Sequence, residues 1–245
     1  MLGTIAHDID RPALARRLRL AARLSLGVVP LLALAACASG RGSATSAIPA
    51  DHPMRLTGDA GAKARAKADS ARRPYTEADI NFMSGMISHH AQAIVMARWA
   101  PTHGASPSVQ TLCARIINAQ QDEIALMQNW LRDRDLPVPE AKPVPMKMKM
   151  NGMEHEMLMP GMLSDAQMQE LDAARGADFD RLFLTYMIQH HKGAVTMVQE
   201  LFAHDGAAQD LTVFKFASDV NVDQSTEIAR MEKMLVLARL QGGGR

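Results

Sequence analysis

The stretch "FMSGMISHHAQAIVMA", residues 82–97, decides the fold because a second version of it follows later in the chain. Residues 183–198 read "FLTYMIQHHKGAVTMV" and repeat Phe, Met, Ile, two adjacent His, Ala and Met at a constant offset of 101 residues. Further identities at an offset of 104 residues link 120–131 with 224–235. The chain therefore contains a duplicated pair of segments, which indicates an internal repeat of one structural unit.

Helix signals bracket these segments. "TEAD", beginning at Thr76, is a capping-box pattern that predicts a helix over 77–100, and Ser106 followed by Pro107 predicts the next one over 107–132. "SDAQ", at 164–167, predicts a short helix that ends near Gly176, and two long helices are expected over 178–204 and 207–240. Two helical hairpins bury their apolar faces most simply against each other. We therefore predict an all-α fold, a four-helix bundle with one long crossover.

The N-terminal segment has the pattern of an export signal. Four arginines among residues 16–23 precede the apolar run "LSLGVVPLLALAAC", which is too short for a stable membrane span. "LAAC" resembles the lipobox of bacterial lipoproteins. We predict a signal peptide over 1–37, lipidation of Cys37, and an exported protein that is anchored to a membrane and faces the periplasm or the cell exterior. The alternative is an ordinary secretory signal that is cleaved nearby.

The rest of the chain divides by composition. Small and charged residues dominate 38–74, which indicates a flexible tether. The bundle domain is expected over 75–240. It comprises a hairpin at 75–133, a Met-rich linker at 134–163 and a second hairpin at 164–240.

The overall composition excludes some classes of function. Lys and Arg number 27 against 26 Asp and Glu, and the lack of a long basic run argues against nucleic-acid binding. No motif of a hydrolase or a nucleotide-binding enzyme stands out. If Cys37 carries lipid, Cys113 is the only cysteine of the mature domain, so an intramolecular disulfide is excluded. We interpret Cys113 as a small core residue, with a soft metal ligand as the alternative.

The histidine pairs lie on the apolar faces of their helices together with methionine and aspartate. At about 100° per residue, Asp79, Met83, Met86 and His90 share a central stripe, and His89 lies beside it. The second copy repeats the aspartate, one methionine and both histidines. Neutral imidazole suits copper, and thioether selects soft Cu(I), so we predict a site for copper, as Cu(I) or Cu(II), or for silver. Its candidate ligands in the two long helices are Asp79, Met83, Met86, His89, His90, Met96, Asp180, Met187, His190, His191 and Met197.

The partner helix of each hairpin is expected to bring a carboxylate to this face. Counting outward from a loop near His103 sets Met83 level with Glu123, and the same count in the second hairpin sets Phe183 level with Glu227. Glu123 and Glu227 therefore join the candidate ligands. The alternative is that the buried histidines are hydrogen-bonded core residues and that Asp79 only completes its capping box.

The linker supplies a second group of possible soft ligands. Its Pro, Lys, Gly and Asn argue against a packed core, so its thioethers have no evident packing role. We predict a flexible capture site for Cu(I), with an accidental Met bias or packing over a hydrophobic groove as the alternatives. The residues concerned are Met146, Met148, Met150, Met153, His155, Met157, Met159 and Met162.

Several stretches together resemble the domain-of-unknown-function 305 family. They are "FMSGMISHHAQAIVMA", "DEIALMQNWL", "MPGMLS", "ADFDRLFLTYMIQHHKGAVTM" and "STEIARMEKML", within about 75–238. The resemblance implies a ferritin-like four-helix arrangement and an extracytoplasmic, metal-associated, non-catalytic role, since the family includes periplasmic copper-binding proteins. It places copper ligation on Met86, His89, His90, Met187, His190 and His191. Met86 and Met187 stand where a di-iron enzyme would have Glu, which disfavours an iron oxidase.

The sequence thus leads to one main hypothesis of function and two alternatives. The main hypothesis is a membrane-tethered lipoprotein, not an enzyme, that binds copper or silver for sequestration, handover or metal resistance. It would have metal-donor or metal-acceptor proteins as partners. A ferritin-like redox enzyme and a metal-free bundle that serves structure or partner binding are the alternatives.

Overall fold

The computed structural model describes residues 57–150 and 153–242, all within the unit Ile48–Arg245. The predicted signal peptide over 1–37, with Cys37, lies outside the described residues. None of the described helices is long and apolar enough to cross a membrane. The elements in chain order are α1 (Gly58–Arg72), α2 (Glu77–Arg98), α3 (Pro107–Arg132), β1 (Met146–Met150), β2 (Met153–Met157), α4 (Asp165–Ala173), α5 (Gly176–Ala203) and α6 (Leu211–Gly242).

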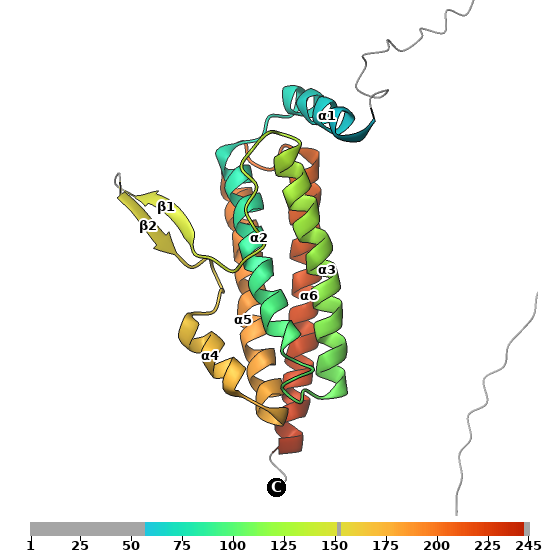
Figure 1. Ribbon diagram of the computed structural model, residues 1–245, viewed down its shortest axis with the longest axis vertical. Helices are drawn as coiled ribbons and strands as arrows, with labels where there is room; N and C mark the ends of the chain where they lie inside the picture. Colours follow the sequence, from blue (N-terminus) through green and yellow to red (C-terminus); the bar gives the residue numbers. More distant parts are fainter. Residues whose placement is uncertain (1–56, 151–152, 243–245) are drawn as a thin grey trace, which may run out of the picture. The chain divides into compact units, whose positions relative to one another are not determined.

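Four long helices form the predicted bundle. α2 packs against α3, α5 packs against α6, and α2 also lies along α5 (Figure 1). The all-α, ferritin-like bundle of two duplicated hairpins with a long crossover is therefore confirmed. α6 begins at Leu211 and not at residue 207, because a turn with Gly206 at φ 77° and Ala208 at φ 55° precedes it.

Both predicted capping boxes are present. At the start of α2, Asp79 N–H donates to Thr76 Oγ1 (3.3 Å) and Thr76 N–H donates to Asp79 Oδ2 (2.7 Å). Ser164 and Gln167 make the same reciprocal pair at the start of α4. These short local signals fix where α2 and α4 begin.

Two elements depart from the prediction. The flexible tether expected over 38–74 is wrong for its last part, because Gly58–Arg72 is helical and is rich in Ala, Lys and Arg, which favour helix. The Met-rich linker contains the antiparallel hairpin β1–β2, shown in yellow in Figure 1. Its alternating sequences "MKMKM" and "MEHEM" have the period of a strand, although methionine, lysine and glutamate are not typical strand residues.

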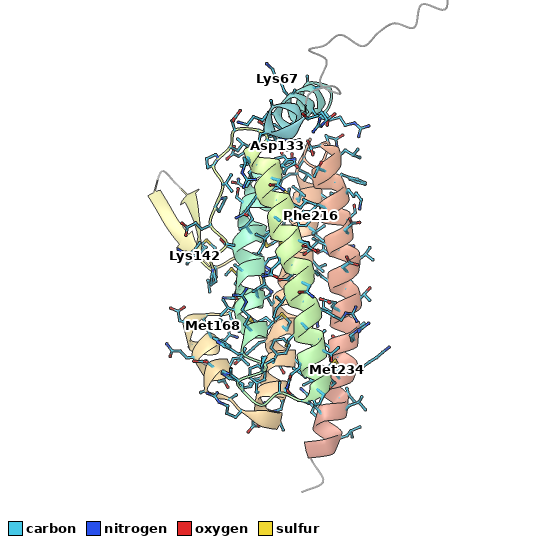
Figure 2. The ribbon with its side chains drawn as sticks, turned by 45° about the vertical axis from the view of Figure 1, so that its right-hand side comes forward. Lys67, Asp133, Lys142, Met168, Phe216 and Met234 are labelled. Atoms are coloured by element: carbon cyan, nitrogen blue, oxygen red, sulfur yellow. The ribbon has the colours of Figure 1, made fainter. Side chains whose placement is uncertain are left out.

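The buried core of the bundle is divided by a polar layer. One apolar cluster contains Phe82, Met127 and Phe216, and the other contains Leu112, Phe179 and Met231. In Figure 2, the labels on Phe216 and on Met234, which packs against the second cluster, mark the two parts of the bundle. The two histidine pairs lie between these clusters along α2 and α5. Burying polar groups at this level is costly unless they find partners, so the layer requires a chemical explanation.

Candidate metal centre

The four histidines of the duplicated motif form a fully buried layer. His89 and His90 on α2, and His190 and His191 on α5, each have a relative exposure of 0%. The rings of His89 and His190 meet across the interface with centroids 3.8 Å apart and planes tilted by 39°. The duplicated helices thus bring the two predicted pairs together at one level of the bundle.

Each partner helix supplies a carboxylate to one histidine. His90 Nε2 lies 2.7 Å from Glu123 Oε2, and His191 Nε2 lies 2.8 Å from Glu227 Oε2. A carboxylate accepts, so the Nε2 atoms carry the protons and, in a neutral ring, each Nδ1 keeps its lone pair. Neither Nδ1 has a hydrogen-bond partner among the described residues. The pattern of one nitrogen donating to a carboxylate while the other is available is the one that metal-bound histidines usually show.

The remaining two histidines also have unsatisfied nitrogens. His89 Nε2 lies 3.0 Å from the carbonyl oxygen of Pro160, which can only accept, so His89 Nδ1 is left with a free lone pair. Neither ring nitrogen of His190 has a partner among the described residues. The side-chain amides of Gln120 and Gln224, one turn before the two glutamates, add further unsatisfied buried atoms. Such a concentration of unsatisfied groups at one level points to a bound species.

A segment of the crossover closes this layer on one side. We call residues 159–163, "MPGML", the docked segment. Gln92 donates to the Leu163 carbonyl (2.9 Å) and accepts from Leu163 N–H (2.7 Å), and Pro160 accepts from His89. Gly161, at φ 77°, and Gly193 on α5 meet so closely that a Cβ on Gly193 would overlap the Pro160 carbonyl. The docked segment therefore lies directly on the backbone of α5 beside the histidines.

Burial keeps two of the histidines neutral. Desolvation, with smaller contributions from neighbouring histidines, lowers the pKa of His89 to about 3 and lowers the pKa of His190 well below its ordinary value. A neutral imidazole has the lone pair that a metal ion needs. On the outer side of the layer, desolvation and the charges of Glu123, Asp219 and Glu227 raise the pKa of Asp223. Carboxylates thus gather where the two His–Glu pairs approach the surface.

The lowered pKa values predict a loss of stability in mild acid. Below about pH 6.5 the unfolded chain binds protons that folded His89 and His190 refuse, so the free energy of unfolding falls as the pH drops towards the folded pKa. We expect His89 alone to cost about 2 kcal/mol at pH 5, with a further loss from His190. Urea unfolding of the metal-free protein at neutral and mildly acidic pH measures this. An identical pH dependence in the His89→Gln variant would contradict the assignment.

Asp79 and Asp180 do not belong to the histidine layer, so their prediction as ligands is wrong. Asp79 Oδ1 accepts from Ala208 N–H (2.7 Å) and its Oδ2 accepts from Thr76, while Asp180 accepts from Ser106 N–H (3.1 Å). Each aspartate lies eleven residues before the second histidine of its helix, about 16 Å along the axis. The duplicated aspartates fasten each hairpin to the loop of the other, because their oxygens satisfy backbone N–H groups there.

Asp79→Ala is expected to lower stability without lowering metal stoichiometry. The change removes the carboxylate that accepts from Thr76 N–H in the capping box and leaves the buried Ala208 N–H unsatisfied, for an expected loss of about 2 kcal/mol. Thermal unfolding and a metal titration on the same sample measure the two quantities. Glu77→Ala, an exposed change in the same helical turn, is the control. A lower stoichiometry in folded Asp79→Ala would restore this carboxylate as a ligand.

The methionines of the long helices are all in the core, at different distances from the histidines. Met86 and Met187 are fully buried one turn before their histidine pairs, and they belong to opposite apolar clusters. Met83, Met96 and Met197 lie six residues from the nearest histidine of their helix, about 9 Å along the helix axis, and pack in the clusters. Among the methionines of the long helices, Met86 and Met187 are therefore the ones that stand closest to the histidine pairs along the helix.

Each glutamate bonds to a histidine about two turns along the helix from the residue predicted to lie level with it. Glu123 bonds to His90 and not to the level of Met83, and Glu227 bonds to His191 and not to the level of Phe183. Side chains on a helix lean towards its N-terminus, so in antiparallel neighbours a histidine and a glutamate lean towards each other. Counting Cα levels from the loop ignores this reach. The same offset in both hairpins reflects their common geometry.

The linker residues differ in their burial. Met159 and Met162, each 5% exposed, are buried in the cluster that includes Met83 and Met86, so their prediction as flexible, exposed ligands is wrong. The groove-packing alternative holds for them, whereas Met157 is exposed. Backbone alone is described for the other five linker residues, which are Met146, Met148, Met150, Met153 and His155.

Two other observations limit what the site can be. Within residues 57–150 and 153–242, no three or more His, Cys, Asp or Glu side chains are grouped so that they could hold a metal ion. Cys113 is buried in an apolar cluster, where desolvation raises the pKa of its thiol to about 12, so a thiolate ligand is disfavoured. The layer therefore presents unsatisfied donor atoms, and not a closed coordination shell.

Sequence reasoning missed the residues that hold the docked segment. Gln92 and Gly193 occupy equivalent positions of the two copies, at the offset of 101 residues, and both contact the segment. A glutamine and a glycine at one repeated position are a visible break in the duplication. This difference between the copies was the signal in the sequence that could have revealed the contact. The crossover occurs once, so it must contact the two copies through different residues.

Comparison with known proteins gives matches of different extent. A crystal structure of a DUF305 protein from Streptomyces coelicolor, assigned as secreted, has 27% sequence identity and a TM-score of 0.55, over 66% of this chain and 93% of that chain. CopM in its Cu(I)-bound form has 28% identity and a TM-score of 0.48, over 64% of this chain and 94% of that chain. CopM structures also include Cu(II)-bound and Ag-bound forms.

A curated relative matches over a shorter region. Uncharacterised protein L153 of Acanthamoeba polyphaga mimivirus is 38% identical over 58 residues, which are 24% of this chain. The chain spans only 38% of the length of that relative.

The family model gives the most extensive match in sequence. The model for the domain of unknown function DUF305 matches residues 79–235. That range contains both histidine pairs, both glutamates and the docked segment, and it is well over half of the 245 residues. The chain belongs to the DUF305 family.

Proposed function

We propose that this protein binds copper or silver ions outside the cytoplasm through its four buried histidines, and that it holds them for sequestration or handover during metal resistance. One observation carries the proposal. His89, His90 and His191 each direct one nitrogen to a carbonyl or carboxylate oxygen and leave the other buried without a partner. Metal-binding histidines use the first contact to fix the ring and the second nitrogen to bind the ion.

The chemistry of the donors favours soft and borderline ions. Imidazole suits both oxidation states of copper, and the thioethers of Met86 and Met187, one turn from the histidines, suit Cu(I) and Ag(I). The low pKa values of His89 and His190 keep these rings neutral, so no proton must leave them before a metal binds. Hard ions such as Mg²⁺ would find too few oxygen ligands in this layer.

The ion is cargo in this proposal, and the protein is not an enzyme. A layer enclosed by α2, α5 and the docked segment favours storage of an ion over contact with a substrate. The extracytoplasmic location accords with the secreted relative from S. coelicolor and with the predicted export signal. Lipidation of Cys37 would hold the protein at a membrane, where metal-donor or metal-acceptor proteins could meet it.

Metal analysis of the protein purified from its native compartment tests the proposal. We expect copper or silver in a fixed ratio to protein after growth with the metal, and release of the ion to a strong chelator. Isolation of a metal-free protein that takes up neither ion would overturn the proposal and support a structural bundle. A retained iron or copper that changes oxidation state with a substrate would instead support a redox enzyme.

A further inference from the structure

The hairpin in the crossover has an ordered pairing that the sequence alone did not reveal. β1 and β2 are antiparallel, with Met146 opposite Met157, Met148 opposite His155, and Met150 opposite Met153. The intervening pairs are Lys147 with Glu156 and Lys149 with Glu154. Every cross-strand pair therefore joins either two soft donor residues or two opposite charges.

This register sorts the residue types onto the two faces of the hairpin. Successive residues of a strand belong to opposite faces, and directly paired residues share a face. The five methionines and His155 consequently share one face, and the two lysines and two glutamates share the other. Opposite charges paired across strands favour this register, because a slip by one residue would place methionines opposite glutamates.

The pairing also sets the spacing of the soft residue types along the hairpin. Residues directly opposite in an antiparallel pair have Cβ atoms about 5 Å apart, so each Met–Met or Met–His pair places two soft-donor residue types side by side on one face. Thioether and imidazole together are ligands for Cu(I) and Ag(I). A lone two-stranded hairpin is only marginally stable in water, so an ion that bridges its strands would also order it.

We infer that the methionine face of β1–β2 is a second binding site for Cu(I) or Ag(I), separate from the histidine layer. The inference takes the class of ion from the proposed function, but it needs none of the four buried histidines. Met157 is two residues from Met159, which is buried in the cluster with Met83 and Met86. Two residues span at most about 7 Å, so the Met146–Met157 end of the hairpin lies close to the docked segment.

The test is a titration of the full chain with silver nitrate in chloride-free buffer, followed by isothermal calorimetry. A hairpin variant with Leu at the five methionines and Gln at position 155 removes the donors and keeps apolar residues. We expect it to lose a tight Ag(I) equivalent that the wild type binds. The changes are Met146→Leu, Met148→Leu, Met150→Leu, Met153→Leu, Met157→Leu and His155→Gln.

A face-exchange variant separates an ordered face from mere composition. It carries Met148→Lys with Lys149→Met, and Glu154→His with His155→Glu, so composition and cross-strand pair types are unchanged. The Met–His pair then belongs to the face opposite the other methionines. We expect its Ag(I) affinity to fall at least about tenfold, a difference of about 1.4 kcal/mol. Wild-type affinity in this variant would overturn the ordered site in favour of a flexible one.

A variant of the histidine layer, called the bundle variant, shows whether a negative result contradicts this inference or the proposed function. It carries glutamine at positions 89, 90, 190 and 191. If the hairpin variant binds Ag(I) like the wild type while the bundle variant loses it, the hairpin inference is overturned and the proposed function stands. If the bundle variant keeps all Ag(I) binding and the hairpin variant loses it, the proposed function of the histidine layer is overturned and the hairpin inference stands. A wild type that binds no Ag(I) overturns both.

Discussion

Replacement of His89, His90, His190 and His191 together by glutamine is expected to weaken Cu(II) binding by about 100-fold or more. Cu(II) is the informative ion because imidazole suits it well, whereas the thioethers of the hairpin favour Cu(I). Glutamine is close to histidine in length and can still donate to Glu123 or Glu227, so the bundle should keep its contacts at these positions. Competition titration against a chromophoric Cu(II) chelator measures the change.

His103→Gln is the matched control for this experiment. His103 is also buried, at 5% exposure, and its Nε2 bonds to Asp172, but it lies in the α2–α3 loop and not in the layer. We expect its Cu(II) affinity to equal that of the wild type. Circular dichroism and unfolding midpoints of both variants show whether each is folded. A folded quadruple variant with wild-type affinity would show that the layer is not the copper site.

Gly193→Ala is expected to destabilise the protein by at least about 3 kcal/mol, although alanine is the better helix former. A Cβ at this position would overlap the Pro160 carbonyl oxygen and crowd Gly161, and both are backbone groups that cannot rotate away. The docked segment would have to leave α5, which exposes Met159 and Met162 and breaks the contact of Pro160 with His89. The change is therefore expected to lower the stability of the protein and to remove the docked segment from the histidine layer.

Two measurements check the Gly193→Ala prediction. Urea unfolding should give a lower midpoint, and amide hydrogen exchange should rise at Leu163, whose N–H bonds to Gln92. Gln199→Ala, an exposed change on the same helix, provides the control. A stabilised Gly193→Ala protein, with the gain of about 1 kcal/mol typical of an open helix position, would show that the docked segment does not lie on α5.

The sequence predicts the bundle and the histidine layer because both depend on repeated, short-range patterns. The offset of 101 residues relates His89 to His190 and places them at equivalent positions of their helices. When the two hairpins pack together, equivalent positions lie at the same height in the bundle. The capping boxes at Thr76 and Ser164 fix helix starts for the same local reason. A pattern with the period of a helix directly predicts which residues lie on the same face of that helix.

Contacts made across long sequence separations escape this reasoning. The aspartates share the central stripe with the histidines, but helical periodicity says which face a residue occupies and not which backbone group it meets at the end of the bundle. Met159 and Met162 were predicted to be exposed because proline and glycine surround them in the sequence. Their burial depends on Gly193, thirty or more residues away, which admits the segment to the helix surface. Only the three-dimensional arrangement joins these residues.

The measurement that tests the central claim most directly is nitrogen NMR of the histidine rings during addition of Ag(I), a diamagnetic ion. In the metal-free protein, His90 and His191 are expected to carry a proton at Nε2, where they contact Glu123 and Glu227. At saturation with Ag(I), the Nδ1 signals should shift strongly while the Nε2 protons remain. Ring signals that stay unchanged while the protein takes up silver would contradict metal binding by the buried layer.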